Sequence, residues 1–396
     1  MKLTHRSTIL ACYNGYITQA ICINLAPLLY VVFQEQFDLS VTAISFLIAV
    51  NFLTQLSIDV LTSRFSRRIN MRFFAVLAHV VTALGLVGLS VFPFLTHPYA
   101  GLLAAEILLG VGGGFTEVVI SPLLEACPTD GKSGNMSLLH SFYCWGQAGV
   151  VLLSGIFFAI LDIHAAWGWL PVIWSVIPLL GAAAFCFVPV YRLPADENGG
   201  LSLRGLFKTP VFLAFLCMML CAGASEMVMS QWASAFAESA LGIDKRVGDL
   251  LGPCMFALMM GTARALYGKF SARLNLRRLM LWGCVGCACS YLLAAFAPHP
   301  MLALAGCALC GLSVGVFWPG ILSRASAAIP MGGMSMFAIL AVAGDLGCLA
   351  GPSVAGWISN AAGKELRWGF CFAVLFPVAY FIILLLQKES KGGKRI

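Results

Sequence analysis

The sequence predicts an all-α integral membrane protein whose twelve transmembrane helices form two pseudo-symmetric six-helix halves. Composition is the first reason. Of the 396 residues, 60% are hydrophobic and 10% are charged, against about 45–50% and about 25% in soluble proteins. The second reason is that several apolar stretches exceed the ~18 residues that mark a helix able to cross the bilayer. The third reason is an internal repeat.

Apolar runs and the residues that interrupt them place the spans. The twelve predicted spans are residues 8–33, 41–62, 73–95, 98–124, 133–160, 166–190, 209–237, 248–268, 278–297, 300–323, 334–360 and 367–387. A polar interruption at residues 191–208 is predicted to be a cytoplasmic linker between halves at residues 1–190 and 209–396. The first apolar run is long and lacks a small-residue cleavage site, so we expect a retained helix rather than a signal peptide.

The basic residues predict the orientation. Most of the 24 Lys and Arg fall on one side of this topology, whereas the opposite loops hold only Lys245, Arg246, Lys364 and Arg367. Positive charge stays on the cytoplasmic side of a membrane. We therefore expect a multi-pass protein of the plasma or bacterial inner membrane with both termini in the cytoplasm. The net charge of +7 then reflects orientation and contact with anionic lipids, not nucleic acid binding.

Several pairs of segments carry the repeat. Residues 59–68 read DVLTSRFSRR and correspond to residues 268–277, which read GKFSARLNLR. Further matches join NMS at 135–137 to GMS at 333–335, and GQAG at 146–149 to GDLG at 344–347. Parallel repeats of this kind are typical of transporters that bind substrate near the membrane midplane, between the halves.

This layout, with basic loops after the second and eighth spans, resembles the major facilitator superfamily over nearly the whole chain. In that family the first loop reads G-x-x-x-D-R-x-G-R-R and is thought to latch helix ends during alternating access. The resemblance implies cytoplasmic gating roles for Arg64, Arg67, Arg68, Arg273 and Arg277. Asp59 and Ser63 stand where the family has Gly and Asp, so the family's Asp-based latch does not carry over to this chain.

Three segments resemble the fucose-permease-like sugar:proton symporters more narrowly. They are FQEQFDLS at 33–40, EVVISP at 117–122, which is similar to an acidic E-x-x-x-x-P element of the fourth helix, and NMSLLHSF at 135–142. The resemblance implies proton-coupled sugar uptake. The first-helix carboxylate that those symporters use has no counterpart, because Pro27 falls at about its position.

Carboxyl groups inside the spans are the candidates for coupling. Glu117, Glu226 and Asp345 lie within apolar helices, where a charge costs about 2.5–3.5 kcal/mol on insertion scales. A carboxyl group shielded from water can take up a proton at physiological pH, so we predict that these three are proton-coupling residues. A clasp between helices is the structural alternative. Glu106, about 16 Å from Glu117 along the same helix face, is expected near the outer mouth in water.

Seven further residues in the spans are predicted to contact the solute. Amides and imidazoles hydrogen-bond to hydroxyl groups, and aromatic rings pack on the apolar face of a sugar. The seven residues are Asn14, Gln19, Asn24, His140, Tyr143, Gln147 and Trp232. Trp and Tyr are also common interfacial anchors. His79 is expected to be structural, and Arg264 is expected to reach the interface or to pair with an acid.

Together these features predict a secondary active transporter working by alternating access, with a small polar solute such as a sugar carried by proton symport. Two alternatives stay open: a proton-driven exporter of amphipathic compounds, and a membrane sensor that does not transport. We predict a monomer in the lipid bilayer, no enzyme activity, no cofactor and no metal. Among the 15 cysteines, the closely spaced ones have no nearby His or carboxylate in the sequence to complete a metal site, so we expect them to pack as small apolar residues; they are Cys284, Cys287, Cys289, Cys307 and Cys310.

Overall fold

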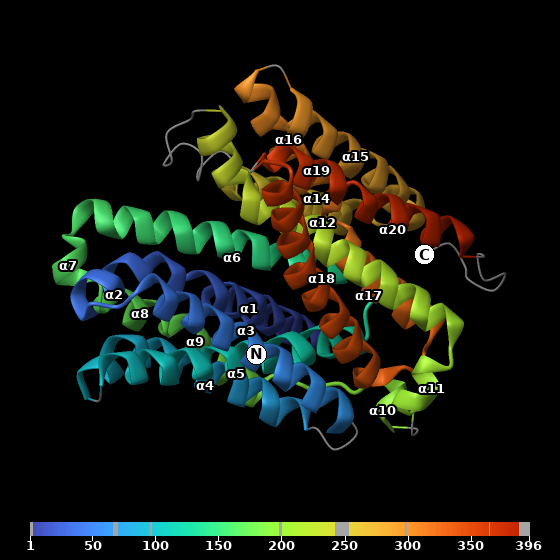
Figure 1. Cartoon of the computed structure of the whole chain (residues 1–396). Coiled ribbons are helices and arrows are strands. Elements are labelled where there is room, and N and C mark those ends of the chain that lie inside the picture. The colour runs from blue at the N-terminus through green and yellow to red at the C-terminus, as the bar shows by residue number, and fades with distance from the viewer. Residues whose placement is uncertain are drawn as a thin grey trace. The chain divides into compact units, whose positions relative to one another are not determined.

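Helices make up the regular structure of the described chain (Figure 1). The computed structural model describes residues 3–65, 70–95, 97–197, 200–241, 253–297, 299–363 and 365–387. The chain forms two compact units. The first unit comprises Met1–Thr129, Trp145–Gly200 and Gly333–Ala338, and the second comprises Asp130–Cys144, Leu201–Gly332 and Ile339–Ile396.

The first unit holds the helices of the N-terminal part of the chain. They are α1 (His5–Asn24), the 3₁₀ turn η1 (Ala26–Leu29), α2 (Tyr30–Phe37), α3 (Val41–Phe65), α4 (Met71–Leu95), α5 (Pro98–Ala126), α7 (Ile163–Ala166), α8 (Trp169–Trp174), α9 (Val176–Phe187) and α10 (Pro194–Glu197). The long helix α6 (Lys132–Ile160) joins this unit from Trp145 onward, while its first turns group with the second unit.

The second unit holds the remaining helices. They are α11 (Leu203–Phe207), α12 (Pro210–Leu241), α14 (Met255–Phe270), α15 (Leu276–Phe296), α16 (Pro300–Val314), α17 (Phe317–Ala328), α18 (Gly333–Ala361), α19 (Leu366–Ala373) and α20 (Leu375–Leu386). The short helices α10 and α11 lie within residues 191–208, the segment in which the sequence predicts the linker.

Eleven helical segments among the described residues are long and apolar enough to cross a membrane. They correspond to eleven of the twelve predicted spans. The remaining span, at 248–268, corresponds to α14, which has 16 described helical residues and is preceded by residues 242–252, outside the described part. The prediction of an all-helical membrane protein with twelve spans is therefore confirmed, with helix ends that differ from the predicted limits by a few residues in either direction.

Prolines interrupt the last span of each half in the same way. Ser175 separates α8 from α9 and Val374 separates α19 from α20, and a proline follows three residues later in both cases, Pro178 and Pro377. Proline has no N–H and its ring clashes with the carbonyl four residues back, so the helix breaks one turn before it. This shared break agrees with the internal repeat in the sequence.

Helix α5 is the centre of the first unit, where it packs along α1, α3 and α4 (Figure 1). Glycines on α5 let α3 approach closely. A Cβ on Gly110 would lie 2.7 Å from the Asn51 carbonyl oxygen, and one on Gly114 would lie 2.8 Å from the Ile58 Cβ. Small residues allow this kind of close helix packing within membranes. The close approach brings polar side chains of α3 against α5.

Helices α12 and α18 approach one another in the same manner in the second unit. A Cβ on Gly347 would collide with the backbone of Leu220, and one on Gly351 would lie 2.8 Å from the Ala224 Cα. The two helices therefore touch almost backbone to backbone. This contact fixes the position of Asp345, which lies on α18 between Gly344 and Leu346.

An arginine near the start of the third span of each half binds the end of the last span. Arg72, the second residue of α4, donates to the carbonyl oxygens of Phe185 and Cys186 at 2.9 and 2.7 Å. Arg277, the second residue of α15, donates to the carbonyl oxygens of Leu384, Leu385 and Gln387 at 3.0, 3.2 and 2.9 Å. The last carbonyls of a helix have no partner within it, and a cation at that end also interacts favourably with the helix dipole.

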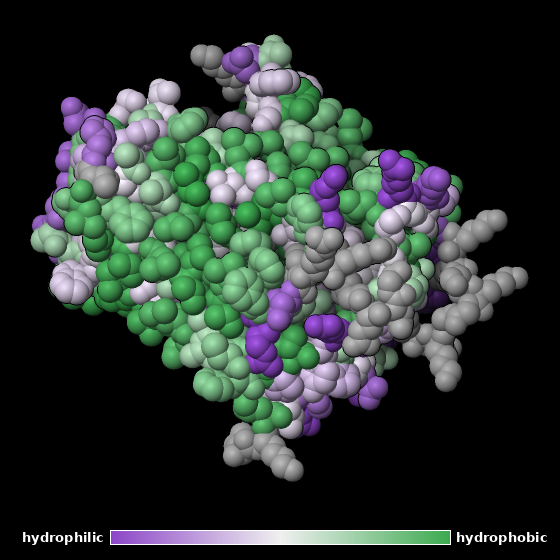
Figure 2. All heavy atoms as spheres, turned by 90° about the horizontal axis from the view of Figure 1, so that it is seen from below, coloured by the Kyte–Doolittle hydropathy of each residue, from purple (hydrophilic) through white to green (hydrophobic). Residues whose placement is uncertain are grey.

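The surface is suited to lipid. Figure 2 shows a face on which hydrophobic residues cover a broad area, with strongly hydrophilic residues at its edges and in one group below its centre. Large apolar side chains point outward from most spans, among them Phe52 at 42%, Leu153 at 57% and Trp282 at 73% exposure. An exposed apolar area of this extent is typical of a membrane-embedded surface.

Candidate functional site

The first unit contains a cluster of polar side chains around Glu117, at the point where α1, α3 and α5 meet. Glu117 lies on α5 and is partly exposed. Its Oε2 atom accepts a hydrogen bond from Gln55 Nε2 of α3 at 2.8 Å, and a longer one from Gln19 Nε2 of α1 at 3.4 Å. Two neutral amides from two different helices therefore point at one carboxylate.

A glycine makes room for these two amides. Gly113 lies one turn before Glu117 on α5, and a Cβ there would lie 2.9 Å from Gln55 Oε1 and 3.5 Å from Gln19 Oε1. Both glutamines are only 4% exposed. Their Oε1 atoms are buried and accept no hydrogen bond from any described residue. A buried acceptor without a donor costs about 1–3 kcal/mol of stability. The structure therefore carries this cost at each of the two oxygens.

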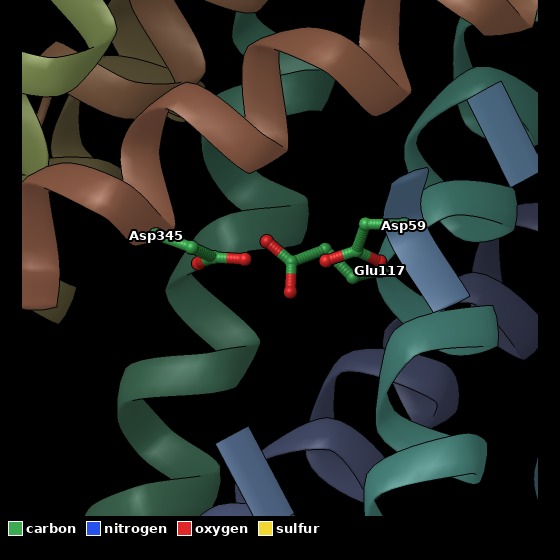
Figure 3. A group of neighbouring side chains, drawn as sticks. All are labelled: Asp59, Glu117 and Asp345. Atoms are coloured by element: carbon green, nitrogen blue, oxygen red, sulfur yellow. The ribbon is translucent and has the colours of Figure 1, made fainter. Parts of the chain in front are cut away.

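Asp59 brings a second carboxylate to Glu117. Asp59 lies one turn after Gln55 on α3 and is fully buried. Figure 3 shows its carboxylate turned toward that of Glu117, with one oxygen of each lying within 4.8 Å of the other. The third residue drawn in Figure 3, Asp345, belongs to the second unit. We name Gln19, Gln55, Asp59 and Glu117 the α1–α3–α5 cluster.

A hydrogen bond one turn further along the helices borders this cluster. The hydroxyl groups of Tyr16 on α1 and Ser121 on α5 lie 2.6 Å apart, and both side chains are buried. Tyr16 and Gln19 are neighbours on one face of α1, as are Glu117 and Ser121 on α5. The cluster is thus held from one end by a bond between the helices that carry it.

The second unit places its carboxylate in a different setting. Glu226 of α12 accepts a hydrogen bond from Arg264 of α14, with Arg264 NH2 and Glu226 Oε2 3.2 Å apart. The Arg264 side chain is 3% exposed and the Glu226 side chain 16%. The prediction that Arg264 pairs with an acid is borne out by this ion pair.

Arg264 also holds the surrounding backbone. Its Nε atom donates to the Gly315 carbonyl oxygen at 2.9 Å, and NH1 donates to the His140 carbonyl oxygen at 3.3 Å and to Cys144 Sγ at 3.1 Å. Gly315 follows α16, and His140 and Cys144 belong to the first turns of α6. One guanidinium on α14 therefore ties two further segments, α6 and the end of α16, to Glu226.

The other predicted solute contacts lie on α1, α6 and α12. Asn14 donates to the Ile177 carbonyl of α9 at 3.2 Å, which directs it away from Glu117, and Asn24 donates to Ala20 of its own helix at 2.9 Å. Trp232 donates to the Pro352 carbonyl of α18 at 3.1 Å. The remaining three lie on α6, where His140 is buried and Tyr143 and Gln147 are partly exposed. Within the first unit, the structure brings Gln19 to Glu117.

The expectation for Glu106 was wrong. Glu106 is 1% exposed and is surrounded by the apolar core of the first unit. Its carboxylate accepts hydrogen bonds from Asn51 Nδ2 at 2.8 Å and from the Tyr30 hydroxyl at 3.1 Å. The expectation used only the position of Glu106 along its helix. The side chain faces α2 and α3, and these two helices shield it from water.

The predicted gating arginines fall into three groups. Arg64 and Arg273 are exposed on the surface. Arg67 and Arg68 lie outside the described residues. Arg277 binds the end of α20 within its own unit, as described above.

Sequence reasoning missed three parts of these sites. It noted Asp59 only as a departure from a loop motif, and it passed over Gln55. A signal was present, because Asn51, Gln55 and Asp59 are spaced by four in an otherwise apolar span and so form a polar stripe on one helix face. The partner of Arg264 had no local signal, since Glu226 lies on another helix.

A bundle of apolar helices with hydrogen-bonded carboxylates in its interior is typical of a membrane carrier. The model of the Major Facilitator Superfamily matches residues 8–336 and 255–396, and the chain belongs to this superfamily of transporters. No curated protein matches the chain in sequence.

Solved structures of sugar symporters share this fold. FucP in its outward conformation has a TM-score of 0.81 at 14% identity, over 97% of this chain and 100% of that one. A variant of the fucose:proton symporter FucP from E. coli has a TM-score of 0.78 at 14% identity, over 98% and 100%. The proton:xylose symporter XylE bound to 6-bromo-6-deoxy-D-glucose has 0.81 at 14% identity, over 96% and 94%. The predicted major facilitator fold is confirmed.

Proposed function

We propose that this transporter takes up a small polar solute such as a sugar by proton-coupled symport, with Glu117 as the principal proton-coupling carboxylate. The observation that carries the proposal is the pair of amides from Gln19 and Gln55 on the Glu117 carboxylate. The fucose:proton and proton:xylose symporters that share the fold lend support from outside the chain. At 14% identity, these two structures support a shared fold and nothing finer.

A glutamine suits a carboxyl group that changes its protonation state. Its amide has both a donor nitrogen and an acceptor oxygen. The nitrogen donates to the carboxylate, as Gln55 Nε2 does to Glu117, and after rotation the oxygen accepts from the protonated acid. When Glu117 takes up a proton, an amide that rotates in this way accepts from the acid, so no two hydrogen-bond donors face each other. The cluster can serve both states without separating its helices.

Glu226 has a partner that fits a coupling role less well. Protonating Glu226 would remove the counter-ion that the structure gives to the buried Arg264 guanidinium, and an uncompensated buried charge is strongly destabilising. We propose that Glu226 keeps its charge and orients the solute, and that Asp345, placed by the close contact of α12 and α18, is the second candidate for proton exchange.

For the solute itself, we propose recognition by side chains that remain partly exposed. The first unit offers Asn24 and Gln147, and the second offers Tyr143 and Trp232. Amides bind hydroxyl groups through paired donors and acceptors, and the aromatic rings add apolar contact area.

Both termini are proposed to lie in the cytoplasm, as the distribution of basic residues predicts.

Reconstituted vesicles test this function. Purified protein in liposomes is given an inward-directed pH gradient, and radiolabelled hexoses, pentoses, polyols and nucleosides are offered in turn. We expect accumulation of at least one of them, and its collapse when a protonophore removes the gradient. Uptake that does not respond to the gradient would contradict coupling. Export of amphipathic drugs in place of uptake would favour the alternative transporter class.

A further inference from the structure

We propose that Tyr291 of α15 is a positioning residue for solute recognition, because its hydroxyl group holds the turn of α12 that carries Glu226. The inference rests on the proposed function in one respect, since it takes Glu226 as a residue that orients the solute. It goes beyond that function because it assigns a role to a fully buried, uncharged side chain on another helix.

The first observation is a hydrogen bond between the two helices. Tyr291 donates from its hydroxyl group to the carbonyl oxygen of Ser225 on α12 at 2.9 Å. Both residues are fully buried, and Ser225 directly precedes Glu226. A tyrosine hydroxyl has a single proton to donate, so this bond commits it to the α12 backbone. The position of the backbone next to Glu226 is therefore coupled to α15.

The second observation concerns the hydrogen bonds within α12. In an α-helix, the Ser225 carbonyl pairs with the N–H of the residue four positions later, which is Met229. The Tyr291 hydroxyl bonds to both ends of this pair, since it also makes a backbone hydrogen bond with Met229. A side chain that enters this ladder changes the local course of a helix. Glu226 lies within the turn concerned.

The tyrosine ring and the helix that it binds are each held by a further contact. The ring of Tyr291 packs edge-on against Phe370 of α19, with centroids 5.9 Å apart and planes inclined by 62°. On α12, a Cβ on Gly223 would collide with the carbonyl oxygen of Gly344 on α18. Helix α12 therefore meets α18 and α15 within the turn before Glu226, which fixes where its carboxylate begins.

Glu226 has one oxygen left for a solute. Its Oε2 atom accepts from Arg264. Its Oε1 atom accepts no hydrogen bond from a described residue, and it is not one of the described oxygens that are both buried and unpartnered. Because the Arg264 side chain is only 3% exposed, the accessible group is an acceptor, which suits a hydroxyl group of the solute. Hydrogen bonds weaken steeply away from their preferred angle, so recognition depends on the orientation of this turn.

Transport kinetics of Tyr291→Phe test the effect on the solute. The variant loses one oxygen atom, after which Ser225 and Met229 can pair directly and the turn around Glu226 shifts. Uptake of radiolabelled hexoses, pentoses, polyols and nucleosides is measured in vesicles under one fixed pH gradient. For each accumulated solute, we expect the half-saturating concentration to rise about fivefold at an unchanged maximal rate. An unchanged half-saturating concentration would overturn the proposal, and so would a loss confined to the maximal rate.

Tyr380→Phe is the matched control in the same unit. Tyr380 is as fully buried as Tyr291, but its hydroxyl makes no hydrogen bond with a described residue. Its ring stacks on Phe317 with centroids 4.6 Å apart, a contact that phenylalanine can keep. The half-saturating concentration should not change. A rise equal to that of Tyr291→Phe would show that the loss of any buried hydroxyl has this effect, and would refute the assignment.

Thermal unfolding of the purified full-length protein tests the link to Glu226 without transport. Tyr291→Phe should lower the unfolding midpoint by roughly 2 °C. In a protein that carries Arg264→Met with Glu226→Leu, the same substitution should lower it by only about half as much, because no ion pair remains to be positioned. Equal losses in both proteins would show that the bond to Ser225 contributes only to stability, and would refute the positioning role.

These outcomes separate the inference from the proposed function. Solutes that accumulate with the same kinetics in the unmodified protein and in Tyr291→Phe would leave symport standing and refute the positioning role. Failure of every solute to accumulate in the unmodified protein would refute the proposed function. The two unfolding losses would then decide by themselves whether Tyr291 positions Glu226.

Discussion

Two carboxylates in the interior of this transporter, one in each unit, are held by opposite kinds of partner. Glu117 accepts hydrogen bonds from two neutral amides, whereas Glu226 is bound by the guanidinium of Arg264, which in turn holds three backbone or sulfur acceptors. An amide tolerates a change of charge on its partner. A buried guanidinium does not. This difference is why we propose that the first unit exchanges a proton and that the second keeps a fixed charge in place.

The two halves differ in which polar residues the corresponding spans carry. The EVVISP segment of α5 aligns through its proline with the VGVFWP segment at 314–319. Glu117 therefore corresponds to Val314, and the fourth helix of the second half has no acid at this position. The helix breaks at Pro178 and Pro377 show that the backbone repeat is retained. The fourth span differs in backbone as well as in side chains, since α5 is continuous whereas its counterpart is divided into α16 and α17.

The largest effect is expected from Glu117→Gln. A pH gradient of one unit supplies about 1.4 kcal/mol per proton, which equals about tenfold accumulation of a cotransported solute. Loss of the exchangeable carboxyl group should abolish this accumulation while solute exchange across the membrane without a gradient persists. Comparison of gradient-driven uptake with counterflow in the same vesicles measures both. Full accumulation by the variant would move the coupling site away from the first unit.

The second largest effect concerns the ion pair. Arg264→Met should destabilise the protein by about 3–5 kcal/mol, because it leaves the mostly shielded carboxylate of Glu226 without its counter-ion. The double variant Arg264→Met with Glu226→Leu should recover most of this loss, since replacing both charges by apolar groups is often neutral. Denaturant unfolding in mixed micelles gives the four free energies of the cycle. Equal loss in the single and double variants would show that the backbone contacts of Arg264, not the pairing, carry its contribution.

A third, smaller effect contrasts the two glycine contacts. Gly347→Ala pushes a methyl group into the Leu220 backbone and should cost about 1–3 kcal/mol through overpacking. Gly113→Ala meets the end of a flexible glutamine, Gln55 Oε1 at 2.9 Å, and should cost less stability but disturb the bond from Gln55 to Glu117. Thermal unfolding and gradient-driven uptake, measured on both variants, should therefore rank them in opposite orders.

The smallest effects are expected at the two helix ends bound by arginine. Arg72→Gln and Arg277→Gln should each cost about 0.3–1 kcal/mol, the usual range for a cation at a helix C-terminus. Because each arginine is the second residue of its helix and binds the end of the last span of its unit, the two losses should be similar. Unfolding midpoints in detergent check this, with Arg273→Gln as an exposed control of the neighbouring loop. A much larger loss at one end would show that the units depend unequally on this contact.

The sequence determines the spans because hydrophobic length and proline are local properties. The sequence also identifies the acids, because an Asp or Glu within an apolar run is visible without any knowledge of the packing. It does not determine which neighbouring helix each acid faces. Glu106 and Glu117 share a face of α5, yet one is covered by Tyr30 and the other remains partly exposed. Only the packing of α2, α3 and α5 decides between these outcomes.

Partners on distant helices were beyond the reach of sequence reasoning for the same reason. Arg264 and Glu226 are separated in the chain by 38 residues, and no spacing rule connects them. Gln55 and Asp59 were within reach, because their spacing from Asn51 follows the helical period. Polar residues without charge attract less notice than acids, although the amides of Gln19 and Gln55 define what Glu117 can do.

The arginine at the start of α4 has a consequence for biogenesis. Arg72 is synthesised and inserted before the helix whose end it binds, and both sides of that bond are present once the chain has reached Cys186. The same order recurs with Arg277 and the end of α20. The bond of Arg72 can therefore form while the spans from α12 onward are still being synthesised, whereas the bond of Arg277 must wait until α20 has been made.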